Sequence, residues 1–332
     1  MTKSEGSSVD GIDSTTQVSG IGEFALIDLI TAGLARPGFV EVGLGDDAAV
    51  VGLTGPRVVV TTDMLVEGRH FRRAWSSAAD IGHRAAAANL ADVVAMGADP
   101  RALVVAIALP SESEVSWVQE LLDGISDECR GVGAAVAGGD TTATDGGIVL
   151  SITALGDLAG RAPVVRSGAR VGDVVALAGR QGWASAGLTV LSRGFRSPRV
   201  LVDALRRPDP PYASGPEAAR VGATSMIDVS DGLVADARHI AAASGVTIAL
   251  ASSLLPVDGP LKDTATAFSA DPLLWVLTGG DDHSLVATFP ADVEPPVGFR
   301  RIGEVVAGDG QVTVDGEPFT EIGGWQHFGP SG

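Results

Sequence analysis

The stretch EVGLGDDAAVVGL, residues 41–53, places Asp46 and Asp47 side by side between glycines and in front of an apolar run. Two adjacent carboxylates repel each other, and no lysine or arginine stands close by in the sequence to offset their charge. A glycine turn alone accounts for such a pair. A hard cation such as Mg²⁺ accounts for it as well, because carboxylate oxygens are its preferred ligands. The rest of the chain has to decide between the two.

Carboxylates follow strongly apolar segments at several other places. They are Asp63 after RVVVTTD, Asp92 on a long predicted helix, Asp140 after AVAGG, Asp228 and Asp231 around Ser230, and Asp281 with Asp282 after two glycines. Each one alone is more often a turn or capping residue. Together they lack basic partners, and isolated buried carboxylates are costly. The set therefore predicts a site for Mg²⁺ carried with a nucleotide.

Composition narrows the class of protein. The chain has 332 residues, 45% of them hydrophobic, and a net charge of −18, which argues against nucleic acid and anionic membranes as partners. No apolar run is long enough to cross a bilayer, and residues 1–19 read as a polar, disordered leader. The single cysteine, Cys129, excludes an internal disulfide and a cysteine zinc site, and an inert thiol is expected. We predict a soluble cytoplasmic protein.

Strand and helix patterns alternate along the chain, which predicts an α/β fold with mixed sheets flanked by helices in two domains. The first half reads as helix 22–35, strand 57–63, helix 77–98, strand 101–110, helix 113–133 with Ser113 as its N-cap, and strands 134–142 and 147–158. The second half reads as strand 174–179, helix 184–194, a Pro-rich connection 206–216, strand 223–230, helix 231–245, strand 246–252, a helix near 271–277, strands 283–289 and 301–306, and a hairpin near 314–319. We place the domains at 20–160 and 161–332.

Phosphate-binding loops of the common kinds are absent from the sequence. It contains neither a GxxxxGK[ST] loop nor a kinase-type Gly-rich loop with a strand lysine, and GRQGWASAG (179–187) is only a weak phosphate signal. Lys3 and Lys262 are the only lysines. A phosphate-handling enzyme with this sequence must therefore rely on metal ions, arginines and backbone N–H groups.

A family resemblance follows from eight motifs in order: GLGDDAAV (43–50), TTDMLVEGRHF (61–71), NLADVVAMGADP (89–100), GGDTT (138–142), VRSGARVGD (165–173), IDVSDGL (227–233), GGDDHSL (279–285) and GWQHF (324–328). Over about residues 20–330 the chain resembles the thiamine-monophosphate kinases. These belong to the ATP-binding superfamily that also includes aminoimidazole ribonucleotide synthetase. The GDD and GGD motifs are shared across the superfamily, whereas TTDMLVEGRHF with NLADVVAMGADP and IDVSDGL is more specific to the kinases.

The resemblance implies a role for each matching residue. Mg²⁺ ligands, direct or through water, would be Asp47, Thr61, Thr62, Asp63, Asp92, Asp140, Asp228 and Asp231. ATP would contact Gly139, Asp140, Arg166 and Ser230, and thiamine monophosphate would contact His70, Asp281 and Trp325. The family also implies a homodimer joined through the N-terminal sheets, and a monovalent cation is a further candidate cofactor.

Two departures from the family pattern concern the substrate end of the site. Asp281, Asp282 and His283 stand where the family usually has Glu, Asp and Tyr, and Ser284 stands where an acid is usual. Asp281 is one methylene shorter than Glu, which shortens its reach. Trp325 fills the expected aromatic position, and a core tryptophan is the competing interpretation.

The chemistry agrees with the residues present. A phosphate oxygen of thiamine monophosphate is already anionic at neutral pH, so no general base is expected, and metal ions would offset the repulsion between two polyanions. The alternatives are another enzyme of the superfamily, such as aminoimidazole ribonucleotide synthetase, or a non-catalytic sensor of nucleotide or thiamine phosphate. Release of ADP in the presence of thiamine monophosphate separates them.

Overall fold

The computed structural model describes residues 15–319, apart from 22–25, 27–28, 36 and 43–49. The chain forms two compact units. Unit 1 lies within Met1–Leu53, Thr62–Ala86 and Arg101–Ala154, and unit 2 within Thr54–Thr61, Ala87–Pro100 and Leu155–Gly332. No helix among the described residues combines the length and the apolar character that crossing a membrane requires.

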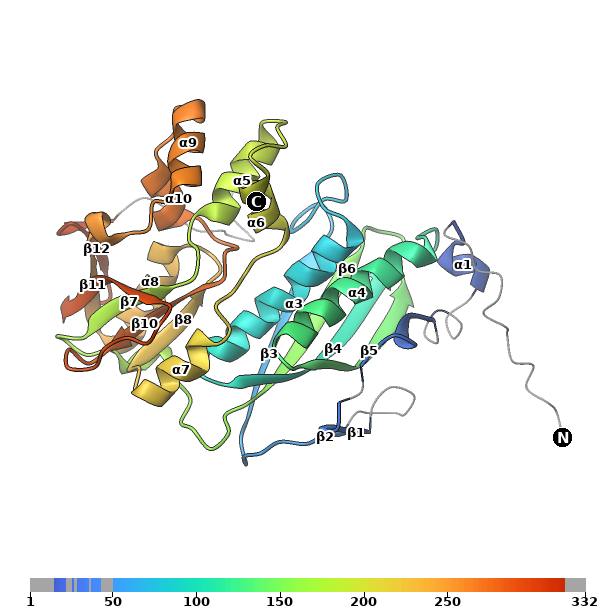
Figure 1. The fold of residues 1–332 in the computed structure, drawn as a ribbon, viewed down its shortest axis with the longest axis horizontal. Coiled ribbons are helices and arrows are strands. Elements are labelled where there is room, and N and C mark those ends of the chain that lie inside the picture. Colours follow the sequence, from blue (N-terminus) through green and yellow to red (C-terminus); the bar gives the residue numbers. More distant parts are fainter. Residues whose placement is uncertain (1–14, 22–25, 27–28, 36, 43–49, 320–332) are drawn as a thin grey trace. The chain divides into compact units, whose positions relative to one another are not determined.

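The first half of the chain forms a four-stranded sheet (Figure 1). Its order is β3-β6-β4-β5, with β3 (Val58–Val66), β4 (Asp99–Leu109), β5 (Ala135–Ala143) and β6 (Val149–Asp157). Strands β4 and β5 pair in parallel, and β3 is an edge strand. Shorter elements precede the sheet: α1 (Val18–Ile21), β1 (Val40–Val42) and β2 (Val50–Val51).

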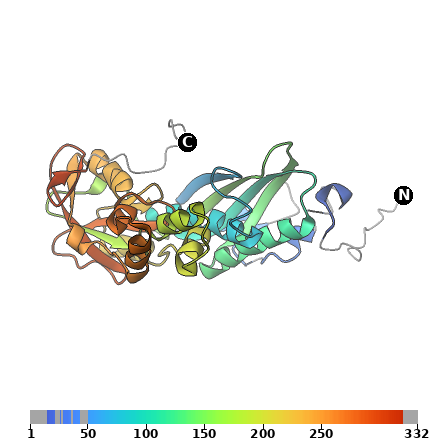
Figure 2. The ribbon, with the colours of Figure 1, turned by 90° about the horizontal axis from the view of Figure 1, so that it is seen from above.

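Two helices pack side by side along this sheet, α3 (Ala78–Ala95) and α4 (Val115–Gly131), as Figures 1 and 2 show. Glycines allow their close approach. A Cβ added at Gly82 of α3 would overlap the Leu121 carbonyl oxygen, and one at Gly124 of α4 would overlap the Ala79 carbonyl oxygen. Cys129 of α4 is buried, and burial raises the pKa of its thiol to about 12, as expected for an inert thiol.

A seven-stranded mixed sheet forms the second half of the chain, in the order β13-β12-β9-β11-β7-β10-β8. Its strands are β7 (Val174–Ala178), β8 (Ser225–Val229), β9 (Val246–Leu250), β10 (Ser284–Phe289), β11 (Phe299–Ala307), β12 (Val312–Val314) and β13 (Glu317–Pro318). The helical segments are η1 (Arg166–Gly168), α5 (Trp183–Ser192), α6 (Arg199–Arg206), α7 (Ser214–Val221), α8 (Leu233–Ser244), η2 (Ser252–Leu254), α9 (Gly259–Phe268) and α10 (Pro272–Thr278).

Both faces of this sheet are covered, because alternate residues of β7 enter different hydrophobic clusters. Val175 and Leu177 pack in one cluster with residues of α8, while Ala176 and Ala178 pack in another with residues of α7. The predicted α/β fold with mixed sheets and flanking helices is thus confirmed, and the domain limits at 20–160 and 161–332 stay a prediction.

Some local predictions were wrong. Ser113 does not cap α4: the N-cap residue is Glu114, which makes no side-chain capping bond, and the buried Ser113 hydroxyl has no hydrogen-bond partner among the described residues. Helices α6, α7 and α9 were not predicted, and α7 begins within the expected Pro-rich connection. The predicted helix 22–35 lies partly outside the described residues.

Candidate active site

The ends of β8 and β10 bring two of the acidic motifs together. The strands pair antiparallel, with Asp228 opposite Leu285, so the residues that follow β8 lie beside those that precede β10. The Asp281 N–H donates to the Ser230 carbonyl oxygen at 2.9 Å, and the His283 N–H donates to that of Val229 at 3.1 Å. The segments IDVSDGL and GGDDHSL therefore form two adjacent, hydrogen-bonded loops in unit 2.

Gly280 is required for this contact. A Cβ at this position would overlap the carbonyl oxygen of Ser230, so only glycine lets the two backbones meet. The turn also places two non-glycine residues in left-handed backbone conformation: Asp281 has φ +65° and His283 has φ +51°. Left-handed backbone at two non-glycine residues is uncommon and occurs often at binding sites.

His283 lies against Asp228, one of the predicted site carboxylates. Its Nδ1 is 3.2 Å from Oδ2 of Asp228, and each of the two side chains is 6% exposed. Burial by itself lowers the pKa of His283, but the hydrogen bond and charge of Asp228, with the charges of Asp281 and Asp92, raise it above 6.5. Asp228 contacts the imidazole, and the charges of Asp281 and Asp92 are near enough to act on it.

Asp236 holds the loop that carries Asp231. Its Oδ2 accepts the N–H groups of Asp231 and Gly232, each at 3.0 Å, from the first turn of α8. Burial and the charge of Asp228 raise the pKa of Asp236 to about 7. Asp228 and Asp231 are therefore electrostatic neighbours of Asp236, and their charges oppose its ionisation.

Thr61 joins β3 to α3 through a predicted site carboxylate. Its Oγ1 donates to Oδ2 of Asp92 at 2.7 Å. The next residue behaves differently, because the Thr62 hydroxyl donates to the Ile152 carbonyl oxygen at 3.0 Å within the sheet. Unit 2 contains Thr61, Asp92, Asp228, Ser230, Asp231 and Asp281, and also Arg166, which lies in η1 against α8.

The other predicted residues belong to unit 1 or lie outside the described residues. His70 Nδ1 accepts the Val66 N–H at 2.9 Å, and Asp140 Oδ1 accepts the Thr141 N–H at 2.9 Å. A Cβ at Gly139 would overlap the Val105 carbonyl oxygen. Thr62 and Asp63 lie on β3. Asp47 and Trp325 lie outside the described residues.

The donors in unit 2 suit Mg²⁺, because they are carboxylate and hydroxyl oxygens that crowd one another. Within the part of the chain that the structure describes, no three His, Cys, Asp or Glu side chains form a complete metal-binding group. Mg²⁺ commonly takes only one or two carboxylates and completes its shell with phosphate oxygens and water. A set of protein oxygen ligands that is too small to fill the metal's coordination shell fits a metal that binds together with a nucleotide.

Sequence reasoning missed Asp236 and the anchoring of the loop 279–284. Gln181 donates to the carbonyl oxygens of Val276 (3.2 Å) and Gly279 (2.7 Å) and accepts the Ser284 hydroxyl at 2.7 Å. Asp282 is buried and accepts the Ala184 N–H at 3.0 Å. The spacing of Asp231 and Asp236 in SDGLVADA was the one available signal, since an acid in the first turn of a helix is a common capping residue.

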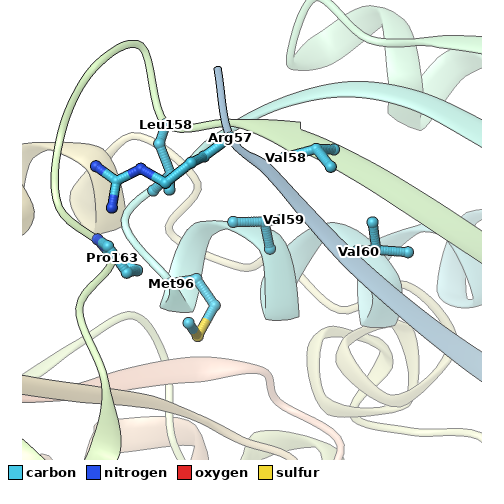
Figure 3. A pocket seen from close by; sticks show the side chains of 7 residues that line it. All are labelled: Arg57, Val58, Val59, Val60, Met96, Leu158 and Pro163. Carbon is cyan, nitrogen blue, oxygen red and sulfur yellow. The ribbon is translucent and has the colours of Figure 1, made fainter. Parts of the chain in front are cut away.

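A separate pocket of about 470 Å³ lies in unit 2 and has no acidic lining (Figure 3). Its walls are Arg57, Val58, Val59, Val60, Met96, Leu158 and Pro163. None of these residues belongs to the predicted site. The Arg57 guanidinium is already used, because its Nη2 donates to the Arg161 carbonyl oxygen at 2.7 Å.

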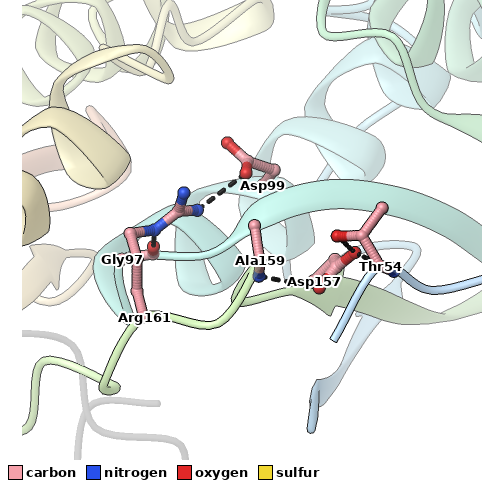
Figure 4. A network of polar contacts seen from close by, with 6 residues as sticks. All are labelled: Thr54, Gly97, Asp99, Asp157, Ala159 and Arg161. Carbon is pink, nitrogen blue, oxygen red and sulfur yellow. Dashed lines mark hydrogen bonds and ion pairs between the residues drawn. The ribbon is translucent and has the colours of Figure 1, made fainter. Parts of the chain in front are cut away.

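Next to this pocket, a polar network fixes the segment that follows β6 (Figure 4). Arg161 donates to Asp99 Oδ2 at 2.7 Å and to the Gly97 carbonyl oxygen at 3.1 Å. Buried Asp157 accepts the Thr54 N–H at 2.7 Å and the Ala159 N–H at 2.8 Å. The carboxylates here have partners of their own, so this network is structural and is not a further metal site.

Comparisons with known proteins agree on one family. Two models match, the AIR synthase related protein N-terminal domain over residues 45–158 and the corresponding C-terminal domain over residues 170–315. A thiamine-monophosphate kinase of Mycobacterium tuberculosis (strain ATCC 25618 / H37Rv) is 47% identical over 310 residues, which cover 93% of this chain and 92% of that protein. That of Corynebacterium glutamicum is 38% identical over 332 residues, covering 96% and 97%. The solved structure "AaThiL complexed with AMPPCP and TMP" is 34% identical, covers 95% of this chain and 100% of its own, and superposes with a TM-score of 0.77.

Proposed function

The chain belongs to the thiamine-monophosphate kinase family, and we propose that it transfers the γ-phosphate of ATP in a single in-line step to thiamine monophosphate. A phosphate oxygen of thiamine monophosphate forms a bond to the γ-phosphorus while the bond from that phosphorus to the β–γ bridging oxygen breaks. The products are thiamine diphosphate and ADP. The attacking oxygen is already anionic at neutral pH, so no side chain has to remove a proton.

The observation that carries this proposal is the meeting of the segments IDVSDGL and GGDDHSL, which brings Asp228 into contact with His283 and the Asp281 backbone into contact with Ser230. An acidic pocket would repel both substrates if it acted alone. Bound Mg²⁺ would neutralise the phosphates and align the attacking oxygen with the γ-phosphorus. The chain's own part is to hold its carboxylates in fixed places before the substrates arrive, and the hydrogen bonds of Asp236 and Thr61 support that part.

We assign the roles as the family motifs place them. Ligands to Mg²⁺, direct or through water, are Asp47, Thr61, Thr62, Asp63, Asp92, Asp140, Asp228 and Asp231. Gly139, Asp140, Arg166 and Ser230 contact ATP. His70, Asp281 and Trp325 contact thiamine monophosphate, whose thiazolium cation suits a carboxylate and an aromatic face. In His70 the Nδ1 atom accepts the Val66 N–H, so in the neutral imidazole Nε2 carries the hydrogen.

A homodimer in the cytoplasm completes the proposal. Edge strand β3 supports the homodimer, because Val58, Val60 and Met64 on one of its faces are 46%, 57% and 55% exposed. An apolar edge strand invites pairing with a second chain.

A coupled assay for ADP release, with thiamine diphosphate measured by chromatography, tests the proposed function. We expect equal amounts of both products, which appear only when ATP, Mg²⁺ and thiamine monophosphate are all present. A protein that binds both ligands without releasing ADP would be a sensor. ADP released with the substrate of an aminoimidazole ribonucleotide synthetase, but not with thiamine monophosphate, would indicate that synthetase activity instead.

A further inference from the structure

The buried pair of His283 and Asp228 calls for an explanation beyond packing. Both side chains are 6% exposed, and the two residues lie 55 positions apart, Asp228 in β8 and His283 directly before β10. A carboxylate oxygen can only accept, so Nδ1 of His283 carries the hydrogen that lies between them. With both side chains buried, this bond at 3.2 Å restricts the orientations open to the Asp228 side chain.

The imidazole has little freedom to move. The His283 N–H donates to the carbonyl oxygen of Val229, the residue that follows Asp228 in β8. Buried Ser284, the next residue, donates its hydroxyl to Gln181 at 2.7 Å. The backbone that carries the His283 ring is therefore held by hydrogen bonds at His283 itself and at Ser284.

We propose that His283 is a positioning residue that orients the Asp228 carboxylate toward the metal accompanying the nucleotide. The inference rests on the proposed function, because it takes Asp228 as a metal ligand. Occupation of Oδ2 by His283 leaves the other oxygen, Oδ1, for the cation. Groups that hydrogen-bond to a metal ligand fix its orientation, and their loss commonly weakens metal affinity by about 10- to 100-fold.

Two substitutions separate the hydrogen bond from the bulk of the ring. H283N keeps a donor, because the Asn amide nitrogen occupies nearly the same place as the histidine Nδ1. H283L fills similar space but removes the donor. His83 in α3 provides a matched control outside the site, since its Nε2 pairs with Glu128 Oε2 in a second, half-buried histidine–carboxylate pair. D228N tests the metal ligand itself.

Metal binding is measured directly, as free Mn²⁺ by electron paramagnetic resonance, in the presence of a non-hydrolysable ATP analogue. Urea titrations confirm that each variant is folded. We expect H283L to weaken Mn²⁺ affinity by about 10-fold or more, H283N to stay within about threefold of the wild type, and H83L to leave the affinity unchanged. The wild type's kinase activity with Mg²⁺ is measured in parallel.

Several results would overturn the inference. A folded H283L protein that binds Mn²⁺ like the wild type would leave His283 no positioning role. Equal losses in H283N and H283L would show that ring shape matters and the hydrogen bond does not. Unchanged binding by D228N would remove Asp228 from the metal site, and with it the reason for the pair. The proposed function fails separately, by an absence of thiamine diphosphate formation in the wild type.

Discussion

Replacing Asp282 with asparagine should remove a large part of the pH dependence of folding stability. Burial raises the pKa of the Asp282 carboxyl from 3.8 to about 7, although the N–H groups of Ala184 and Gly182 and the charge of Arg180 lower it. The folded protein therefore keeps a proton on Asp282 at pH values where the unfolded chain has released it. This group's contribution to stability is complete below about pH 4 and is lost as the pH rises through about 7.

The size of the effect follows from the two pKa values. At ~1.4 kcal/mol per pKa unit, the interval from 3.8 to about 7 corresponds to about 4 kcal/mol. Some ~3 kcal/mol of this is lost between about pH 5 and about pH 8.5. Asparagine carries no charge at any pH, and its side-chain oxygen can still accept the Ala184 N–H, which Asp282 Oδ1 accepts at 3.0 Å.

Urea unfolding followed by tryptophan fluorescence, in metal-free buffer at a series of pH values, measures this directly. The unfolding free energy of D282N minus that of the wild type should increase by ~3 kcal/mol from about pH 5 to about pH 8.5. D145N serves as the control, because Asp145 is exposed and its replacement should leave the difference flat. A D282N difference that does not change with pH would refute the assignment of a protonated, buried carboxyl.

Further predictions concern the site and the assembly. D92N and D231N should lose most of the turnover while their circular dichroism stays that of the wild type; near-full activity at low Mg²⁺ would contradict the metal assignment. D281N and W325A should raise KM for thiamine monophosphate and leave KM for ATP nearly unchanged, and equal changes in both constants would remove these residues from the substrate site. G280A should lower stability by ~1–3 kcal/mol in urea unfolding, because its Cβ overlaps a carbonyl oxygen; wild-type stability would mean that the loop relaxes easily. Light scattering at micromolar concentration should give twice the 33.5 kDa chain mass, and a monomer mass would count against the dimer.

Elements with a strong hydrophobic period could be predicted from the sequence, whereas those that depend on remote partners could not. Helix α3 and strand β4 were predicted to within a few residues because their apolar runs are long. The start of α4 was placed wrongly, since the Val115 N–H donates to the Thr16 carbonyl oxygen, a partner about a hundred residues away. Nothing near Ser113 in the sequence reveals that contact.

The helices that were not predicted begin with residues that suggest turns. Helix α7 contains Gly215 and Pro216 in its first turn, where proline is tolerated because the first N–H groups need no helical partner. Gly215 is needed there because a Cβ would overlap the Val94 carbonyl oxygen. Close packing, and not local preference, selects these residues.

In the candidate site too, the residues could be predicted from the sequence, but their contacts could not. The family motifs identified Asp228, Asp231 and Asp281, but their mutual arrangement depends on the antiparallel pairing of β8 with β10. The partner of His283 became visible only through that pairing, because a sequence carries no direct sign of which strands are neighbours.

The contact between Gly280 and the Ser230 carbonyl oxygen also links two binding events. One side of this contact carries Asp281, assigned to thiamine monophosphate, and the other carries Asp228, Ser230 and Asp231, assigned to metal and ATP. With no side chain between the backbones, neither segment can shift without moving the other. When one ligand orders its segment, the other segment is partly ordered as well. The second ligand then loses less conformational entropy on binding. The affinities for metal–nucleotide and for thiamine monophosphate should rise together, and by the same factor in each direction, since such coupling is reciprocal.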